Sequence, residues 1–354
     1  QVYDSGDYGA VLERALAAAD YTGLRRRQAE RRRAGELVGL GLSLYVEPAA
    51  LGWESGVVRV ERSGAVTAIT GSSPHGQGHE TTFAQIVAEH LGVDAAAVTV
   101  RHGDTQGAPH GSGTAGSRST ALGGGALVLA ARDVRDKGRR IAAVLLEAAA
   151  ADVVAAPGGF HVVGAADRAV IWRAVAEAAY RMGALPRDIE PGLEATRFFE
   201  PSGEVWSSGA FVVALRVERE TGVIVPERIV WVDDAGTIVN PLLADGQLEG
   251  SLAQAWGQIM MEAIAFDADG HVLTGSLMDY ALPRADEVPV AEILHHDTPS
   301  PLNPLGAKGL GEAGTIGLPP AVVNAVVDAL APLGVRHVNM PLTPARIWAA
   351  IGGR

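Results

Sequence analysis

The spacing of hydrophobic and polar positions changes several times along the first half of the chain, and each change predicts a different element. Apolar residues recur at helical spacing over residues 5–34, where Asp7 is a suitable N-cap. Short alternating or β-branched runs, separated by glycine and serine, are typical of strands. The strands expected on this basis cover residues 37–46, 57–61, 65–70 and 98–101. Two further helices are expected, one from the end of the loop 71–78 to about residue 90 and one over residues 120–151.

A second series of elements begins after Pro191. Two β-rich runs predict a hairpin that turns at Glu220-Thr221-Gly222, and the loop 234–241 then leads into a helix that ends near residue 262. The remaining expected elements are the hairpin strands 208–219 and 223–233, short strands at 272–273 and 291–294, a loop at 299–320, a helix at 321–330 started by Pro319-Pro320, and a last helix from Pro344.

The two series resemble each other, because each has paired strands, a loop that contains Gly-Gln, and a helix that contains Ala-Gln. The matching dipeptides are Gly76-Gln77 with Ala84-Gln85, and Gly246-Gln247 with Ala253-Gln254. The mixed order of strands and helices does not fit a regular βαβ barrel. The sequence therefore predicts an α+β fold of two related subdomains, residues 1–190 and 191–354.

Composition excludes several classes of protein. The 354 residues carry a formal net charge of −12, which argues against a general nucleic-acid or anionic-membrane binder. The absence of cysteine excludes disulfides, thiolate zinc sites, cysteine nucleophiles and cysteine-ligated iron–sulfur clusters in this chain. We expect no membrane span, since no stretch reaches the roughly 18 apolar residues that one requires. We expect no signal peptide, since no basic stretch is followed by an apolar one, and the first residue, Gln1, predicts a processed or partial chain.

Two glycine-rich loops that precede helices have the composition of anion-binding sites. The loop 72–82 contains Gly76, Gln77 and Gly78 at a helix start, where backbone amides and the helix dipole attract anions. The loop 111–120 combines hydroxyl side chains with Arg118, which suits a phosphate. The alternatives are an ordinary helix-entry turn for the first loop and a flexible linker for the second.

A third loop, residues 305–315, places one carboxylate among small residues. Glu312 has no bulky neighbour to block a substrate, and a buried glutamate can act as a general base. The alternative is a turn whose glutamate faces solvent. Histidines do not add a metal site: His75 and His79 lie in a loop with Pro74, and His295-His296-Asp297 is expected to be structural.

These loops together resemble the xanthine oxidase, aldehyde oxidase and aerobic carbon monoxide dehydrogenase family, in the C-terminal half of its molybdenum-binding large subunit. The resemblance covers nearly the whole chain. The motifs that carry it are Gly-Gln-Gly-His-Glu-Thr-Thr at 76–82, Gly-Ser-Arg-Ser-Thr at 116–120, Val-Asp-Asp-Ala-Gly-Thr at 232–237, the Gly-Gln and Ala-Gln pairs at 246–254, Lys-Gly-Leu-Gly-Glu-Ala-Gly at 308–314, and the opening residues 3–8.

The resemblance implies a molybdopterin with molybdenum, in the cytosine dinucleotide form, bound between two molybdenum-binding domains. Glu312 would be the catalytic base in the transfer of a water-derived hydroxyl to a substrate carbon. No protein side chain would ligate the metal. The implied cofactor contacts are Gly76, Gln77, Gly78, Thr82, Gly116, Ser117, Arg118, Ser119, Asp234 and Gln254.

The resemblance also implies partners and a location. Family members have an N-terminal half that carries the substrate-contacting loop, so this sequence does not name the small-molecule substrate. Because the chain has no cysteine, the 2Fe-2S clusters and the FAD would lie on partner subunits, in a cytoplasmic complex. The alternative function is a non-catalytic cofactor-binding or assembly scaffold of the same fold, for which the carboxylate of Glu312 would have no use.

Overall fold

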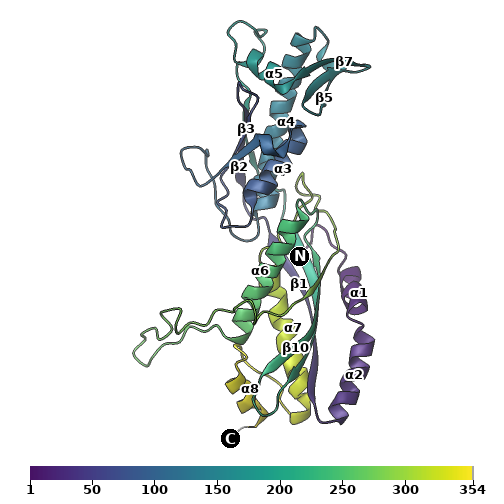
Figure 1. Ribbon diagram of the computed structural model, residues 1–354, viewed down its shortest axis with the longest axis vertical. Coiled ribbons are helices and arrows are strands. Elements are labelled where there is room, and N and C mark those ends of the chain that lie inside the picture. Colours follow the sequence, from purple (N-terminus) through teal and green to yellow (C-terminus); the bar gives the residue numbers. More distant parts are fainter. Residues whose placement is uncertain (353–354) are drawn as a thin grey trace.

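The computed structural model describes residues 1–352 and shows an elongated molecule with an upper and a lower lobe stacked along its long axis (Figure 1). Each lobe has a sheet covered by helices, so the expected α+β class is confirmed. The chain leaves the lower lobe after Ala49 and returns to it at Val205, and these two residues are paired in neighbouring strands.

The lower lobe is built on a four-stranded sheet with helices on both faces. Its strand order is β1(Leu37–Ala49), β9(Val205–Val217), β10(Ile224–Asp234) and β11(Glu292–His295), and only the β10–β11 pair is parallel. Side chains of β9 alternate: Phe211 and Val213 face one core, whereas Ala210 and Val212 face the other. The first core is closed by α6(Pro241–Met260), α7(Ala313–Leu330) and α8(Pro344–Ile351), and the second by α1(Tyr8–Ala18) and α2(Tyr21–Arg33).

The upper lobe has a second four-stranded sheet and a smaller one. The order in the larger sheet is β4(Val98–Arg101), β3(Val66–Thr70), β2(Glu54–Val60) and β8(Glu194–Phe199), packed against α3(His79–Leu91) and α4(Ser119–Leu145). The smaller sheet consists of β5(Val153–Ala156), β6(Gly159–Val162) and β7(Ala165–Ile171), next to α5(Trp172–Ala179). Short 3₁₀ turns complete the fold at η1(Ala95–Ala97), η2(Ala150–Asp152) and η3(Ala331–Leu333).

The sheets group the chain differently from the expected division at residue 190. Strand β1 belongs to the first expected subdomain but pairs along its whole length with β9 in the second. Strand β8 comes after residue 190 but pairs with β2 in the upper lobe. The reason is that strand pairing depends on contacts between distant segments, which the local pattern of one strand does not specify.

Two expected helices have different limits in the structure. Residues 5–34 form α1 and α2 rather than one helix, because Asp20 adopts a left-handed conformation with φ 49° and caps α2 by accepting a hydrogen bond from Gly23 N at 3.2 Å. The helix expected at 321–330 begins eight residues earlier, and Pro319 and Pro320 lie inside it. Burial of its apolar side chains against β1 and α6 stabilises α7 despite the two missing N–H groups.

Helix α7 also corrects the expectation that no stretch is apolar enough to cross a membrane. Within residues 1–352, Ala313–Leu333 passes that test by length and composition, with a mean hydropathy of 1.5. However, Ala321, Ala325 and Ala329 are fully buried against the lower-lobe sheet. The helix is therefore a core helix of this fold.

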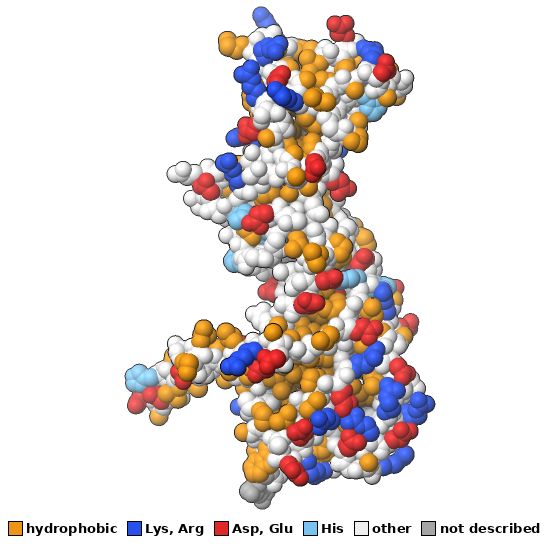
Figure 2. Space-filling view, viewed as in Figure 1, with side chains coloured by type: hydrophobic (Ala, Val, Ile, Leu, Met, Phe, Trp, Pro, Cys, Tyr) orange, Lys and Arg blue, Asp and Glu red, His pale blue; other side chains and the backbone are white. Residues whose placement is uncertain are grey.

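A long arm projects sideways from the lower lobe between α6 and β11, over residues 261–291 (Figure 1). Figure 2 shows hydrophobic side chains exposed along it. Leu277 is 78% exposed and Met278 is 93% exposed, values that a side chain of this size reaches only when nothing packs on it. Val288 and Ala291 near its end pack against the core next to α6 and α7, whereas the outer part of the arm presents exposed apolar surface.

Candidate cofactor-binding and active site

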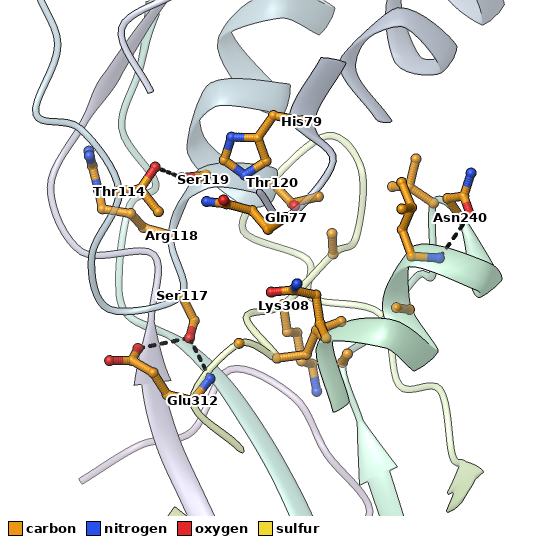
Figure 3. A pocket seen from close by; sticks show the side chains of 18 of the residues that line it. Gln77, His79, Thr114, Ser117, Arg118, Ser119, Thr120, Asn240, Lys308 and Glu312 are labelled. Carbon is orange, nitrogen blue, oxygen red and sulfur yellow. Dashed lines mark hydrogen bonds between the residues drawn. The ribbon is translucent and has the colours of Figure 1, made fainter. Parts of the chain in front are cut away.

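A cavity of about 700 Å³ lies where the two lobes meet. Figure 3 shows side chains from four separate segments facing it. Its upper wall comes from residues 75–79 and 114–120, and its lower wall from residues 235–254 and 307–312. The three loops singled out in the sequence therefore meet in one place. The expected site residues that line the cavity are Gly76, Gln77, Gly116, Ser117, Arg118, Ser119, Gln254 and Glu312.

Four helices begin at this cavity, so their positive dipole ends point toward it. They are α3, α4, α6 and α7, whose first residues or N-caps line or adjoin the cavity wall. Asn240 caps α6 by accepting a hydrogen bond from Leu243 N at 3.1 Å, and Ser251 Oγ accepts one from Gly314 N in the first turn of α7 at 3.2 Å. The N-cap residues of α3 and α4 make no side-chain cap bond. The first N–H groups of α3 and α4 remain available, and such groups bind phosphate and other anions.

Ser117 and Glu312 join the second and third loops at the cavity wall (Figure 3). Ser117 Oγ donates a hydrogen bond to Glu312 Oε2 at 2.8 Å and accepts one from Glu312 N at 3.2 Å. Ser117 has a left-handed backbone, with φ 50°, which carries a strain cost for a residue with a Cβ. The Glu312 side chain is exposed, which leaves its carboxylate accessible from the cavity.

A second carboxyl group, which the sequence analysis missed, lies behind Glu312. Glu47 on β1 is only 4% exposed, and Ser207 Oγ donates to its Oε2 at 3.2 Å. Burial, together with the negative charge of the nearby Glu312, raises the pKa of Glu47 to about 7. The signal in the sequence was that Glu47 is the one carboxylate of β1, a strand whose other residues are mostly apolar.

The first loop contributes both an amide and a histidine to the cavity. Gln77 Oε1 accepts a hydrogen bond from His75 N, which folds the loop back on itself. His79 is 4% exposed, stacks on Phe83 with ring centroids 4.9 Å apart, and has a buried Nδ1 with no partner. Burial lowers the pKa of His79 to about 4, so its imidazole is neutral near pH 7. An unpartnered buried ring nitrogen at a cavity wall suits a ligand that completes its hydrogen bond.

Two expected contacts of the first loop lie outside the cavity lining. Gly78 is the N-cap of α3 with φ 77°, and its Cα lies close to Leu243. Thr82 is buried one turn into the helix, where its Oγ1 donates to the Gly78 carbonyl at 3.3 Å. These two residues shape the start of α3 rather than face the cavity.

Arg118 has protein partners in the structure, and its expected phosphate contact stays a prediction. Its guanidinium forms a buried ion pair with Glu54 at 3.2 Å and donates to the carbonyls of Leu51, Trp53 and Gly113. The side chain of Arg118 is 7% exposed and that of Glu54 is fully buried. Through these partners the guanidinium anchors the second loop to the start of β2.

Asp234 is likewise engaged inside the protein and does not line the cavity. Its carboxylate pairs with Lys308 Nζ at 2.9 Å, and both side chains are fully buried. Asp234 also accepts hydrogen bonds from Gly236 N at 3.0 Å and Thr298 N at 3.1 Å. The pair therefore fixes the third loop against β10, which places Glu312. Gln247 faces the cavity beside Gln254, although the sequence analysis did not assign it a contact.

The candidate metal ligands do not gather at the cavity. Among residues 1–352, the one group of three close potential ligands is Asp267, Asp269 and His271, all exposed on the arm. His295 instead pairs with Asp245 at 3.0 Å.

Comparison with known proteins shows the family of this chain. The family described as molybdopterin cofactor-binding domain matches residues 14–289. The chain belongs to the molybdopterin cofactor-binding family. The resemblance inferred from the loop motifs is therefore confirmed at the level of the family.

Relatives of this molybdopterin-binding chain are similar over almost its whole length. The carbon monoxide dehydrogenase large chain of Hydrogenophaga pseudoflava is 38% identical, over 99% of this chain and 45% of the relative. The nicotine 6-hydroxylase large subunit of Paenarthrobacter nicotinovorans is 36% identical, over 99% and 45%. The crystal structure of quinoline 2-oxidoreductase from Pseudomonas putida 86 superposes with a TM-score of 0.93 at 37% identity, over 100% and 47%. The chain thus spans about half the length of the curated relatives it matches.

The residues at the cavity fit a molybdopterin cofactor. A pterin with phosphate groups needs anion sites, close backbone approach and donors or acceptors for a heterocycle. The two uncapped N-termini of α3 and α4 supply the anion sites, and Gly76 and Gly116, with open space beside their Cα atoms, allow the close backbone approach. Gln77 and the unpartnered ring nitrogen of His79 supply hydrogen-bonding groups for the heterocycle.

Proposed function

We propose that this chain is the cofactor-binding half of the large subunit of a molybdenum hydroxylase, with Glu312 as the catalytic base. The observation that carries the proposal is the position of Glu312, whose exposed carboxylate is fixed by Ser117 at the wall of the inter-lobe cavity. When bound, the molybdenum cofactor supplies oxygen-transfer and electron-accepting chemistry.

The chain holds the cofactor mainly through backbone groups. Its form is molybdopterin cytosine dinucleotide, whose pyrophosphate needs more than one anion site, and the uncapped starts of α3 and α4 offer two. Gly76 and Gly116 allow the ligand to approach the backbone, while Gln77 and Gln254 bind polar edges of the cofactor. A cavity of about 700 Å³ lies within the usual range of cofactor sites.

The role of Glu312 is to accept a proton while a water-derived hydroxyl is transferred to a substrate carbon. Its side chain is held by a hydrogen bond from Ser117 to one carboxylate oxygen, which leaves the other oxygen free to take the proton. The small neighbours Gly311 and Ala313 leave room beside it for a substrate. A non-catalytic scaffold of the same fold is the alternative function, and it would not need this carboxylate.

The proposal includes partner chains. The relatives are about twice as long, so a further molybdenum-binding half completes the cavity wall and supplies the substrate contacts. The exposed apolar side chains of the arm at 261–291 favour burial against another chain. An iron–sulfur subunit and an FAD subunit carry electrons away, because this chain has no cysteine to hold a cluster. We place the complex in the cytoplasm.

The test is Glu312→Gln in the assembled complex, co-expressed with its partner chains. Glutamine keeps the size and the hydrogen bond to Ser117 but cannot accept the proton. Turnover of the substrate should fall by about 10²–10⁴-fold, while molybdenum content and thermal midpoint stay unchanged. Glu13→Gln on the exposed face of α1 is the matched control. Turnover within about tenfold of the unmodified enzyme, with molybdenum in place, would refute Glu312 as the base.

A further inference from the structure

Glu47 is a buried carboxyl group that the proposed reaction does not yet use. It lies on β1 opposite Ser207 of β9, near the end of the strand that approaches the cavity. Its side chain is 4% exposed, and a carboxyl group at such a position is costly unless it is neutral or well paired. Within its own strand the neighbours Val46 and Pro48 are apolar.

Two serine hydroxyl groups lie next to the carboxyl groups of Glu47 and Glu312. Ser207 Oγ donates to Glu47 Oε2 at 3.2 Å, but the single hydroxyl proton of Ser117 is directed to Glu312 at 2.8 Å. The carboxyl group of Glu47 also faces Glu312, so two acidic side chains meet behind the cavity wall. Two facing carboxyl groups are stable when they share one proton, and repel each other when both are ionised.

We propose that Glu47 is a positioning residue for Glu312: its protonated carboxyl group donates a hydrogen bond to the Glu312 carboxylate and holds it at the cavity wall. The inference rests on the proposed role of Glu312 as the base. Burial supports the assignment of the proton, because the buried Glu47 is harder to ionise than the exposed Glu312.

The charges around Glu47 determine how this contact depends on pH. It faces Glu312 at the start of α7, and the other acidic groups of its surroundings are Tyr45 on β1 and Asp233 on β10. Asp233 is fully buried and accepts a hydrogen bond from Tyr45 at 2.7 Å. The pKa of Glu47 is raised to about 7, so raising the pH through that value removes its proton. The ionised Glu47 then repels Glu312, and kcat should fall on the alkaline side.

The first experiment compares Glu47→Gln with Glu47→Ala in the assembled complex. The glutamine amide donates permanently, so kcat should stay within about threefold and its alkaline decline should disappear. Alanine cannot donate, so kcat should fall by roughly tenfold or more, which corresponds to the loss of one hydrogen bond to a charged group. If both variants changed only the thermal midpoint and kept the pH profile of the unmodified enzyme, Glu47 would be structural and the proposal would be overturned.

The second experiment follows the proton itself by infrared difference spectroscopy of the same complex. The C=O band of a protonated carboxyl group should titrate near pH 7, disappear in Glu47→Gln, and persist in Asp233→Asn. In Glu312→Gln its midpoint should move down by roughly one pH unit, because the negative neighbour is gone. A band that is unaffected by both Glu47→Gln and Glu312→Gln would refute the contact. An active Glu312→Gln enzyme would instead refute the proposed function, so the two failures are distinguishable.

Discussion

Replacing Arg118 by alanine should destabilise the upper lobe rather than remove a cofactor contact. The change leaves the carboxylate of Glu54, which is fully buried, with only the backbone N–H groups of Ser55 at 2.9 Å and Ser112 at 3.4 Å. It also removes the donor for three backbone carbonyls. Removing one partner of a buried ion pair typically costs about 3–5 kcal/mol. For a lobe of this size the thermal midpoint should fall by roughly 6–20 °C.

The assay is thermal unfolding of the chain followed by calorimetry, with Arg197→Ala as the matched control. Arg197 lies in the same lobe and pairs with Asp133, but its side chain is 53% exposed, so its loss should cost less than about 1 kcal/mol. The double variant Glu54→Leu with Arg118→Met should be less destabilised than the sum of its single changes. The reasoning fails if Arg118→Ala keeps its thermal midpoint and instead loses cofactor from the assembled complex.

Two further outcomes are expected from the cavity loops. Gly309→Ala should unfold the third loop and lower the thermal midpoint, because the new Cβ would lie 2.4 Å from the Cβ of Ser117. Gly311→Ala is the control and should be tolerated, since the nearest neighbour of its new Cβ would be 3.6 Å away. Equal thermal midpoints for the two variants would contradict the close packing at Gly309. Burial lowers the pKa of His79 from 6.5 to about 4. Between these two pH values the unfolded chain binds a proton at His79 more readily than the folded chain does. The stability that this group contributes above pH 6.5 is therefore lost as the pH falls toward 4. His79→Gln should therefore flatten the decline of the thermal midpoint between those pH values, and an unchanged slope would show that His79 is not the group responsible.

The local pattern predicted those parts of the fold in which neighbouring residues determine the structure. The hairpin between β9 and β10 turns at Glu220-Thr221-Gly222, where Glu218 N donates to the Val223 carbonyl at 2.8 Å, as expected. Helix α8 begins at Pro344, because proline suits the first helical turn. The same rule gave the wrong start for α7, since burial of its apolar residues overrides the signal of Pro319-Pro320.

The candidate site was predictable as a set of loops but not as a set of contacts. Glycine and hydroxyl side chains before a helix indicate an anion site, and these loops do meet at one cavity. The partners of Arg118 and Asp234 were not predictable, because Glu54 and Lys308 lie 64 and 74 residues away in the sequence. An arginine in a phosphate-like loop has the same local pattern whether it faces a ligand or a buried glutamate. Only the three-dimensional pairing distinguishes the two roles.

The pairing of Ala49 with Val205 means that the upper lobe is a domain inserted into a hairpin. Residues 50–204 leave and re-enter the lower sheet at one paired position, and the insert itself begins and ends as the adjacent strands β2 and β8. A short turn that joins Ala49 directly to Val205 would turn β1 and β9 into an ordinary hairpin and keep all the strand pairs of the lower sheet. The fold is therefore modular where the two lobes join, because the register of the lower sheet is set by β1 and β9 and not by the residues inserted between them.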